Sequence, residues 1–161
     1  MGASYWLMNT LLRISGIGKL VSFYGYIYLN QPRLTRLAGL VLILVVGAIH
    51  LIETPAQLDA AIYLGVLFVA NFAGTLMAAI GIFRGAKGWG WTLGALISGL
   101  SLLGYLASRL FGLPSFAEAA GEWDEPLGTF AMILESLFLA GWISVITGLA
   151  VAAPDKRDWH D

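Results

Sequence analysis

The sequence predicts an all-α membrane protein, an antiparallel bundle of four transmembrane helices with both termini in the cytoplasm and an amphipathic interfacial segment at the N-terminus. Of its 161 residues 58% are hydrophobic and only 12% are charged, with a mean hydropathy of +0.79. Soluble proteins have about 25% charged residues, so this composition belongs to the membrane class. Four long apolar stretches and the sorting of basic residues to one side complete the prediction.

The four predicted spans form one domain over residues 34–152. A helix needs about 20 mostly apolar residues to cross the hydrocarbon core of a bilayer. The stretches that meet this requirement are residues 34–51, 60–83, 89–111 and 127–152. They are separated by "ETPAQLD", "RGAKG" and "GLPSFAEAAGEWDEP", which contain the glycine, proline and polar residues typical of connections.

Basic residues near the ends of membrane helices favour the cytoplasmic side. With four spans and an internal N-terminus, eight of the nine lysines and arginines lie inside. They are Arg13, Lys19, Arg33, Arg36, Arg84, Lys87, Lys156 and Arg157. Only Arg109 is predicted outside, and the connections after the first and third spans therefore face away from the cytoplasm.

Residues 1–33 are predicted to lie on the membrane surface, and residues 153–161 to form a cytoplasmic tail. The first segment is apolar but contains Arg13 and Lys19. A charge at the bilayer centre costs at least about 2.5–3.5 kcal/mol, which an interfacial position avoids. A fifth span over residues 4–29 remains an alternative.

Four ionisable residues are predicted to converge in the outer leaflet: His50, Glu53, Arg109 and Glu135. Glu135 lies deepest, and charged groups at this depth need a partner or a wet cavity. One interpretation is an ion pair with Arg109 that joins the third helix to the fourth. A protonated Glu135, or Glu135 as a ligand or proton acceptor, are the alternatives.

His50 has a structural and a functional interpretation. It either hydrogen-bonds to a neighbouring group, or it binds a transition metal together with Glu53 and Glu135. A single axial histidine could also hold haem or a chlorophyll-type macrocycle. The outer acidic loop with Glu122, Asp124 and Glu125 is either a surface turn or a site for a cation or partner.

Small residues let membrane helices approach closely. In the fourth span they recur at intervals of four, which places them on one face of a helix. This stripe comprises Ser136, Ala140, Ser144, Gly148 and Ala152. It predicts contact with other membrane subunits or with a second copy of the chain. The net charge of −1 gives no reason to expect nucleic acid.

Three segments resemble a family of small four-helix bacterial membrane proteins of actinobacterial type. They are "IHLIETP" with the span that follows it, "GWGWTLGALISGLSLLGYLASRLFGLP" and "EWDEPLGTFAMILES". The most specific features are His50-Leu51, the stretch from Ser108-Arg109 to Gly112-Leu113-Pro114, and Glu135. The resemblance implies a four-helix fold in the bacterial cytoplasmic membrane with a polar outer face. It implies no reaction, and Gln57 stands where members often have a further histidine.

The sequence leaves three classes of function open. No nucleophile elbow, phosphate loop, dinucleotide fingerprint or paired metal motif is present. The absence of cysteine removes thiolate sites. The favoured function is therefore a non-catalytic accessory subunit of a larger membrane complex. The second is an outward-facing metal- or cofactor-binding protein that uses His50, and the third is a small transporter or membrane enzyme.

Overall fold

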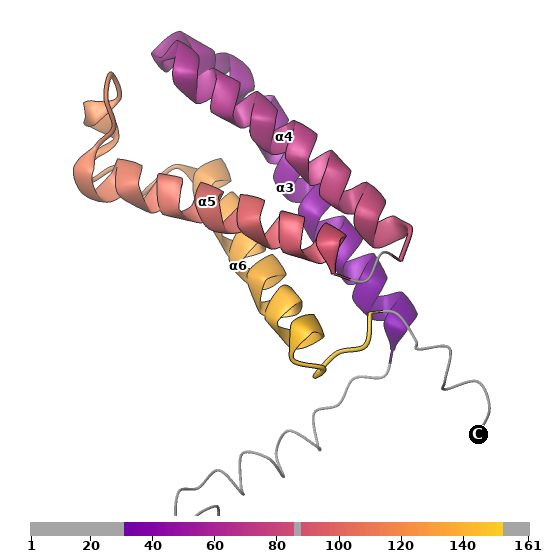
Figure 1. Ribbon diagram of the computed structural model, residues 1–161. Helices are drawn as coiled ribbons and strands as arrows, with labels where there is room; N and C mark the ends of the chain where they lie inside the picture. Colours follow the sequence, from indigo (N-terminus) through magenta and orange to yellow (C-terminus); the bar gives the residue numbers. More distant parts are fainter. Residues whose placement is uncertain (1–30, 86–87, 153–161) are drawn as a thin grey trace, which may run out of the picture.

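The computed structural model describes residues 31–85 and 88–152, which form four long helices and one 3-10 turn (Figure 1). The elements are α3 (Pro32–Ala60), α4 (Ile62–Phe83), α5 (Trp89–Phe111), η1 (Ala117–Ala119) and α6 (Pro126–Ile146). All four α-helices have the length and the apolar composition needed to cross a membrane. The predicted all-helical chain with four spans is thus confirmed over the described residues, which contain no strand. The interfacial segment and the tail lie outside these residues, except for residues 31–33.

Helix α3 extends nine residues beyond its predicted end at residue 51 and includes Pro55. A proline inside a helix removes one backbone hydrogen bond, which is why the sequence suggested a break here. Two contacts support the helix around this position. The Thr54 hydroxyl donates to the His50 carbonyl at 2.8 Å, and the side chain of Leu58 lies directly against Gly65 of α4. Packing against the next helix therefore outweighs the local signal for a turn.

Helix α6 ends at Ile146, six residues before its predicted end. Gly148 has a φ of 76°, a left-handed conformation that glycine adopts without strain. The chain turns back there, and the Ala150 amide donates to the Ser144 carbonyl at 2.9 Å. The predicted small-residue stripe is consequently interrupted. Its last two members lie beyond the helix, and Ala152 packs against the core.

The helices form a closed ring in which each packs against two others. Helix α4 lies between α3 and α5, and α6 lies between α5 and α3. In Figure 1 the purple α3 and magenta α4 run side by side in opposite directions, while α5 and α6 form the second pair. We call the end where α3 and α5 finish and α4 and α6 begin the pocket end, and the opposite end the Arg84 end.

The two ends of the ring are packed differently. Near the Arg84 end α4 and α5 touch backbone to backbone, because a Cβ added to Gly90 would lie 2.7 Å from the Gly81 carbonyl carbon. The axes of α4 and α5 then diverge toward the pocket end (Figure 1). The apolar core fills the Arg84 half with Trp91 stacked on Phe138, ring centroids 5.6 Å apart, beside Ile43 and Ile82.

Candidate functional site

A pocket of ≈ 360 Å³ lies between the diverging helices of the pocket end. All four long helices line it, together with the connection between α5 and α6. Its apolar walls include Leu64, Leu67, Phe68, Ile97 and Leu100. Its polar and charged lining residues are His50, Glu53, Gln57, Asn71, Ser101, Tyr105, Ser108, Arg109, Glu125 and Glu135.

Four of the polar residues lie at the same depth, one on each helix. His50 is ten residues before the end of α3, and Ser101 is ten residues before the end of α5. Asn71 is nine residues after the start of α4, and Glu135 is nine residues after the start of α6. At 1.5 Å per residue each position is about 14–15 Å along its helix from the pocket end, which is half the thickness of a bilayer core of about 30 Å. We call these four residues the polar layer.

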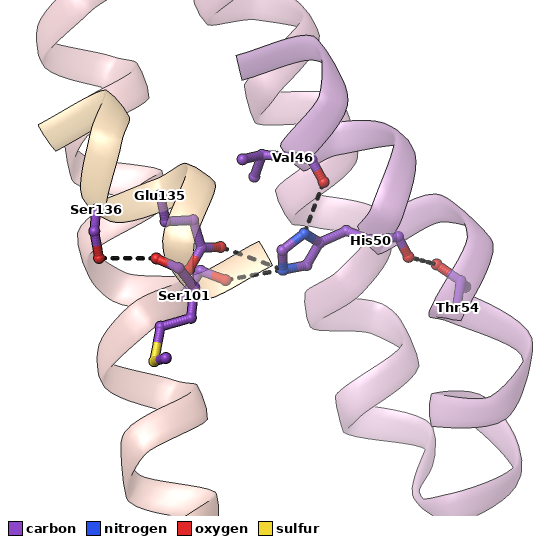
Figure 2. Close-up of polar contacts among 7 residues, drawn as sticks. Val46, His50, Thr54, Ser101, Glu135 and Ser136 are labelled. Carbon is purple, nitrogen blue, oxygen red and sulfur yellow. Dashed lines mark hydrogen bonds and ion pairs between the residues drawn. The ribbon is translucent and has the colours of Figure 1, made fainter. Parts of the chain in front are cut away.

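His50 is held by hydrogen bonds on both ring nitrogens (Figure 2). Nδ1 is 2.9 Å from the Val46 carbonyl oxygen, and Nε2 is 2.8 Å from Oγ of Ser101. A carbonyl oxygen only accepts, so Nδ1 must carry a proton. The histidine therefore presents Nε2 toward α5 and α6. His50 as a whole is buried, with only 6% of its surface exposed.

Glu135 faces the same nitrogen from α6. Its Oε1 lies 3.8 Å from His50 Nε2, and Ser101 also hydrogen-bonds to the carboxyl group. Glu135 is 1% exposed, and within the described chain its Oε1 atom has no hydrogen-bond partner. Figure 2 shows His50, Ser101 and Glu135 pointing toward one another from three different helices. The three side chains thus form one hydrogen-bonded unit at the base of the pocket.

Arg109 has a different partner from the predicted one. Its guanidinium forms an ion pair with Glu125 at the start of α6, and Nη1 donates to the Ala119 carbonyl at 3.4 Å. The guanidinium carbon also lies 4.8 Å from the centre of the Tyr105 ring. The predicted pair with Glu135 is replaced because Glu135 lies ten residues further along α6, about 15 Å deeper. Arg109 therefore ties the α5–α6 connection to α5.

The predicted metal ligands are only partly brought together. His50 and Glu135 are neighbours, and Glu53 lines the same pocket. Over the described residues no group of three His, Cys, Asp or Glu side chains is arranged to hold a metal ion. In the outer acidic loop Glu122 and Asp124 are exposed. Glu125, the third member, turns inward to Arg109.

Asn71 and Ser101 are site residues that the sequence reasoning missed. Both are uncharged and occur in long apolar runs, so neither stood out as His50 and Glu135 did. Counting residues from each helix end would have placed all four at one depth. The sequence does not yield this count, because the first span is predicted to end at residue 51. His50 is then predicted at the membrane surface.

Comparisons with protein-family models, with curated proteins and with solved structures found no match to this chain. The resemblance to a small bacterial membrane family therefore stays a prediction.

The arrangement combines an apolar pocket with a small number of convergent polar groups. Pockets of about 300–1,000 Å³ with this lining are typical of small-molecule sites. The walls can accept an apolar body, and the polar layer can orient one hydrogen-bonding group. The unit of His50, Ser101 and Glu135 can also hold or pass on a proton.

Proposed function

We propose that this chain is a multi-pass membrane protein that binds a small molecule in the pocket between its four helices. The observation that supports the proposal is the polar layer, in which every helix contributes one polar residue at the same depth. Polar side chains at membrane depth are costly and usually line a functional site. A bundle with only a structural role would gain more from apolar packing here, as it does in the Arg84 half.

We further propose that the pocket end faces away from the cytoplasm of a bacterial cell. Among the described residues, Arg33, Arg36 and Arg84 lie at the opposite end of the bundle. Arg109 lies at the pocket end but is paired with Glu125. By the positive-inside rule, this distribution supports a cytoplasmic position for the Arg84 end.

The accessory-subunit function stays a second proposal, supported by a different surface. Ser136 and Ala140 of the interrupted stripe are exposed on α6. Their face is free to contact another membrane helix through small residues. This surface is separate from the pocket, so the two functions are compatible.

Two glycines of α5 allow a matched test of the pocket. A Cβ added at Gly104 or at Gly99 would meet no atom within 4 Å, so both sites tolerate a side chain. Gly104 lines the pocket and Gly99 does not. Gly104→Leu should therefore fill the pocket, whereas Gly99→Leu should leave it open.

Native mass spectrometry of the protein released from lipid nanodiscs would show any molecule retained from the cell. We expect an added mass on wild type and on Gly99→Leu that is lost in Gly104→Leu. Identical spectra for all three proteins would contradict the ligand-binding proposal.

Thiol labelling tests the access and the orientation in the cysteine-free chain. In intact cells a membrane-impermeant reagent should label Ala117→Cys and should not label Arg84→Cys. Ser101→Cys should also label, more slowly when combined with Gly104→Leu than with Gly99→Leu. Labelling of Arg84→Cys alone would show that the protein has the reverse orientation. An unreactive Ser101→Cys beside a reactive Ala117→Cys would refute an open pocket.

A further inference from the structure

The chemical class of the ligand follows from the groups at the base of the pocket, and this step rests on the ligand-binding function proposed above. The proton on His50 Nδ1 is committed to the Val46 carbonyl. The other nitrogen, Nε2, faces Glu135 Oε1 at 3.8 Å. Ser101 hydrogen-bonds to both groups, and its hydroxyl can donate its one proton to only one of them while it accepts a proton from the other. The pair therefore holds one exchangeable proton, either on Nε2 or on the carboxyl group.

The deep part of the pocket is rich in acceptors. Glu135 Oε1 and Asn71 Oδ1 are buried, and neither has a hydrogen-bond partner within the described chain. Buried polar atoms without partners are rare in folded proteins and call for an explanation. A ligand with two or more hydrogen-bond donors would satisfy them.

The ionisable groups of the pocket carry an excess of negative charge. Helix α3 contributes His50 and Glu53, α4 contributes none, α5 contributes Tyr105 and Arg109, and α6 contributes Glu125 and Glu135. Arg109 is balanced by Glu125. The pair of His50 and Glu135 with its shared proton is neutral as a whole, which leaves Glu53 unbalanced. Removal of the shared proton would add a second negative charge. This environment favours a cationic ligand over an anionic one.

The rim of the pocket is open to an apolar molecule. Leu67 on α4 and Leu100 on α5 line the pocket and are 58% and 61% exposed. In a membrane such side chains face lipid, so a molecule dissolved in the bilayer can reach the pocket between α4 and α5. The centroids of the Phe68 and His50 rings are 4.9 Å apart, so Phe68 forms an aromatic wall at the deep end of the pocket.

We propose that the pocket binds a lipophilic primary or secondary amine in exchange for one proton. The ammonium group lies in the polar layer, donates to Glu135 and Asn71, and replaces the proton shared by His50 and Glu135. That proton leaves to the solution on the pocket side. The apolar part of the ligand lies between Leu67 and Leu100. An ammonium group provides both the donors and the positive charge that this environment favours.

Three probes with one body and different head groups test the proposal: benzylamine, benzyl alcohol and benzoate. Each is titrated calorimetrically into the protein in lipid nanodiscs, with empty nanodiscs as the control for partitioning. Repeating the titration in buffers of different ionisation enthalpy gives the number of protons released. We expect benzylamine to bind best, with release of about one proton per molecule bound.

Two variants separate the role of Glu135 in the buried pair from the role of the charge on Glu53. Glu135→Gln should weaken benzylamine binding by at least about tenfold, because a charge-assisted hydrogen bond is roughly twice as strong as a neutral one. It should also abolish proton release. Glu53→Gln removes a charge from the same pocket and should retain proton release. Undiminished release in Glu135→Gln would overturn the exchange mechanism.

The outcomes distinguish this inference from the function on which it rests. Equal or tighter binding of benzyl alcohol or benzoate would overturn the amine assignment while supporting a ligand pocket. If none of the probes binds, yet Gly104→Leu removes a retained molecule, the amine assignment fails and the ligand-binding function stands. If no probe binds and the mass spectra are identical, both fail.

Discussion

The closest backbone approach between α4 and α5 provides the sharpest test of the packing. Gly90 and Gly81 are both buried where the two helices cross. A Cβ added to Gly90 would lie 2.6 Å from the Ile82 nitrogen and 2.7 Å from the Gly81 carbonyl carbon. Both neighbours are backbone atoms, so no side-chain rotation can relieve the contact. Gly90→Ala should therefore force α4 and α5 apart.

The size of the effect is best judged against Gly99→Ala in the same helix. A Cβ at Gly99 meets nothing within 4 Å, so this variant should gain up to about 1 kcal/mol from helix propensity. Gly90 is the second residue of α5, where this gain is smaller than in the helix interior, so the difference between the two variants is at least the cost of overpacking. Overpacking costs about 1–3 kcal/mol, and an unyielding backbone contact belongs in the upper half of that range. The two variants should differ by about 2–3 kcal/mol in the free energy of unfolding.

Titration with sodium dodecyl sulfate in mixed micelles, followed by circular dichroism, measures this difference. Gly81→Ala should behave like Gly90→Ala, because its Cβ would lie 2.7 Å from Gly90 Cα. The double variant should cost less than the sum of the single ones, since one separation of the helices relieves both contacts. A difference below about 0.5 kcal/mol between Gly90→Ala and Gly99→Ala would refute the close approach.

Three further changes test other contacts with the same unfolding assay. Glu125→Gln should cost about 3 kcal/mol and more than Arg109→Ala, because it leaves the buried Arg109 charge without its carboxylate, whereas Arg109→Ala leaves a Glu125 that solvent can reach; a larger loss in Arg109→Ala would contradict this. Phe138→Ala should cost about 3–5 kcal/mol through the cavity left beneath Trp91, and a loss below about 1 kcal/mol would show that the core is loosely packed. Tyr63→Phe removes the hydrogen bond to the Pro114 carbonyl and should cost about 1 kcal/mol; unchanged stability would show that this bond contributes nothing.

The helices could be predicted because they depend on local composition and length. The third span was placed at 89–111 and is α5, bounded by glycines with φ of 103° and 71° that mark both ends. The C-terminal ends of the first and last helices were less predictable. Pro55 indicated a turn, but α3 continues past it because Leu58 packs on Gly65 of another helix. At Gly148 the residue spacing suggested that the last helix continues, but the backbone turns.

The charged residues of the site could be identified from the sequence, but their partners could not. Glu135 and Arg109 stood out because ionisable side chains are rare in apolar spans. Which carboxylate meets Arg109 depends on the length of the α5–α6 connection and on where α6 begins. The structure gives it Glu125 and leaves Glu135 beside His50. The choice of partner for Arg109 decides whether Glu135, the deepest acid, is a structural partner or part of a pocket.

By itself the sequence determined that this chain forms four apolar helices long enough to span a membrane and which charged residues interrupt them. These properties are local, because hydrophobicity and helix length need no knowledge of neighbouring segments. Only the tertiary structure decided that His50, Asn71, Ser101 and Glu135 form one layer, and that the helices part around them. Such a layer depends on the relative depth and rotation of four helices. Contacts between residues distant in the sequence, such as Trp91 stacked on Phe138, hold α5 and α6 in this arrangement.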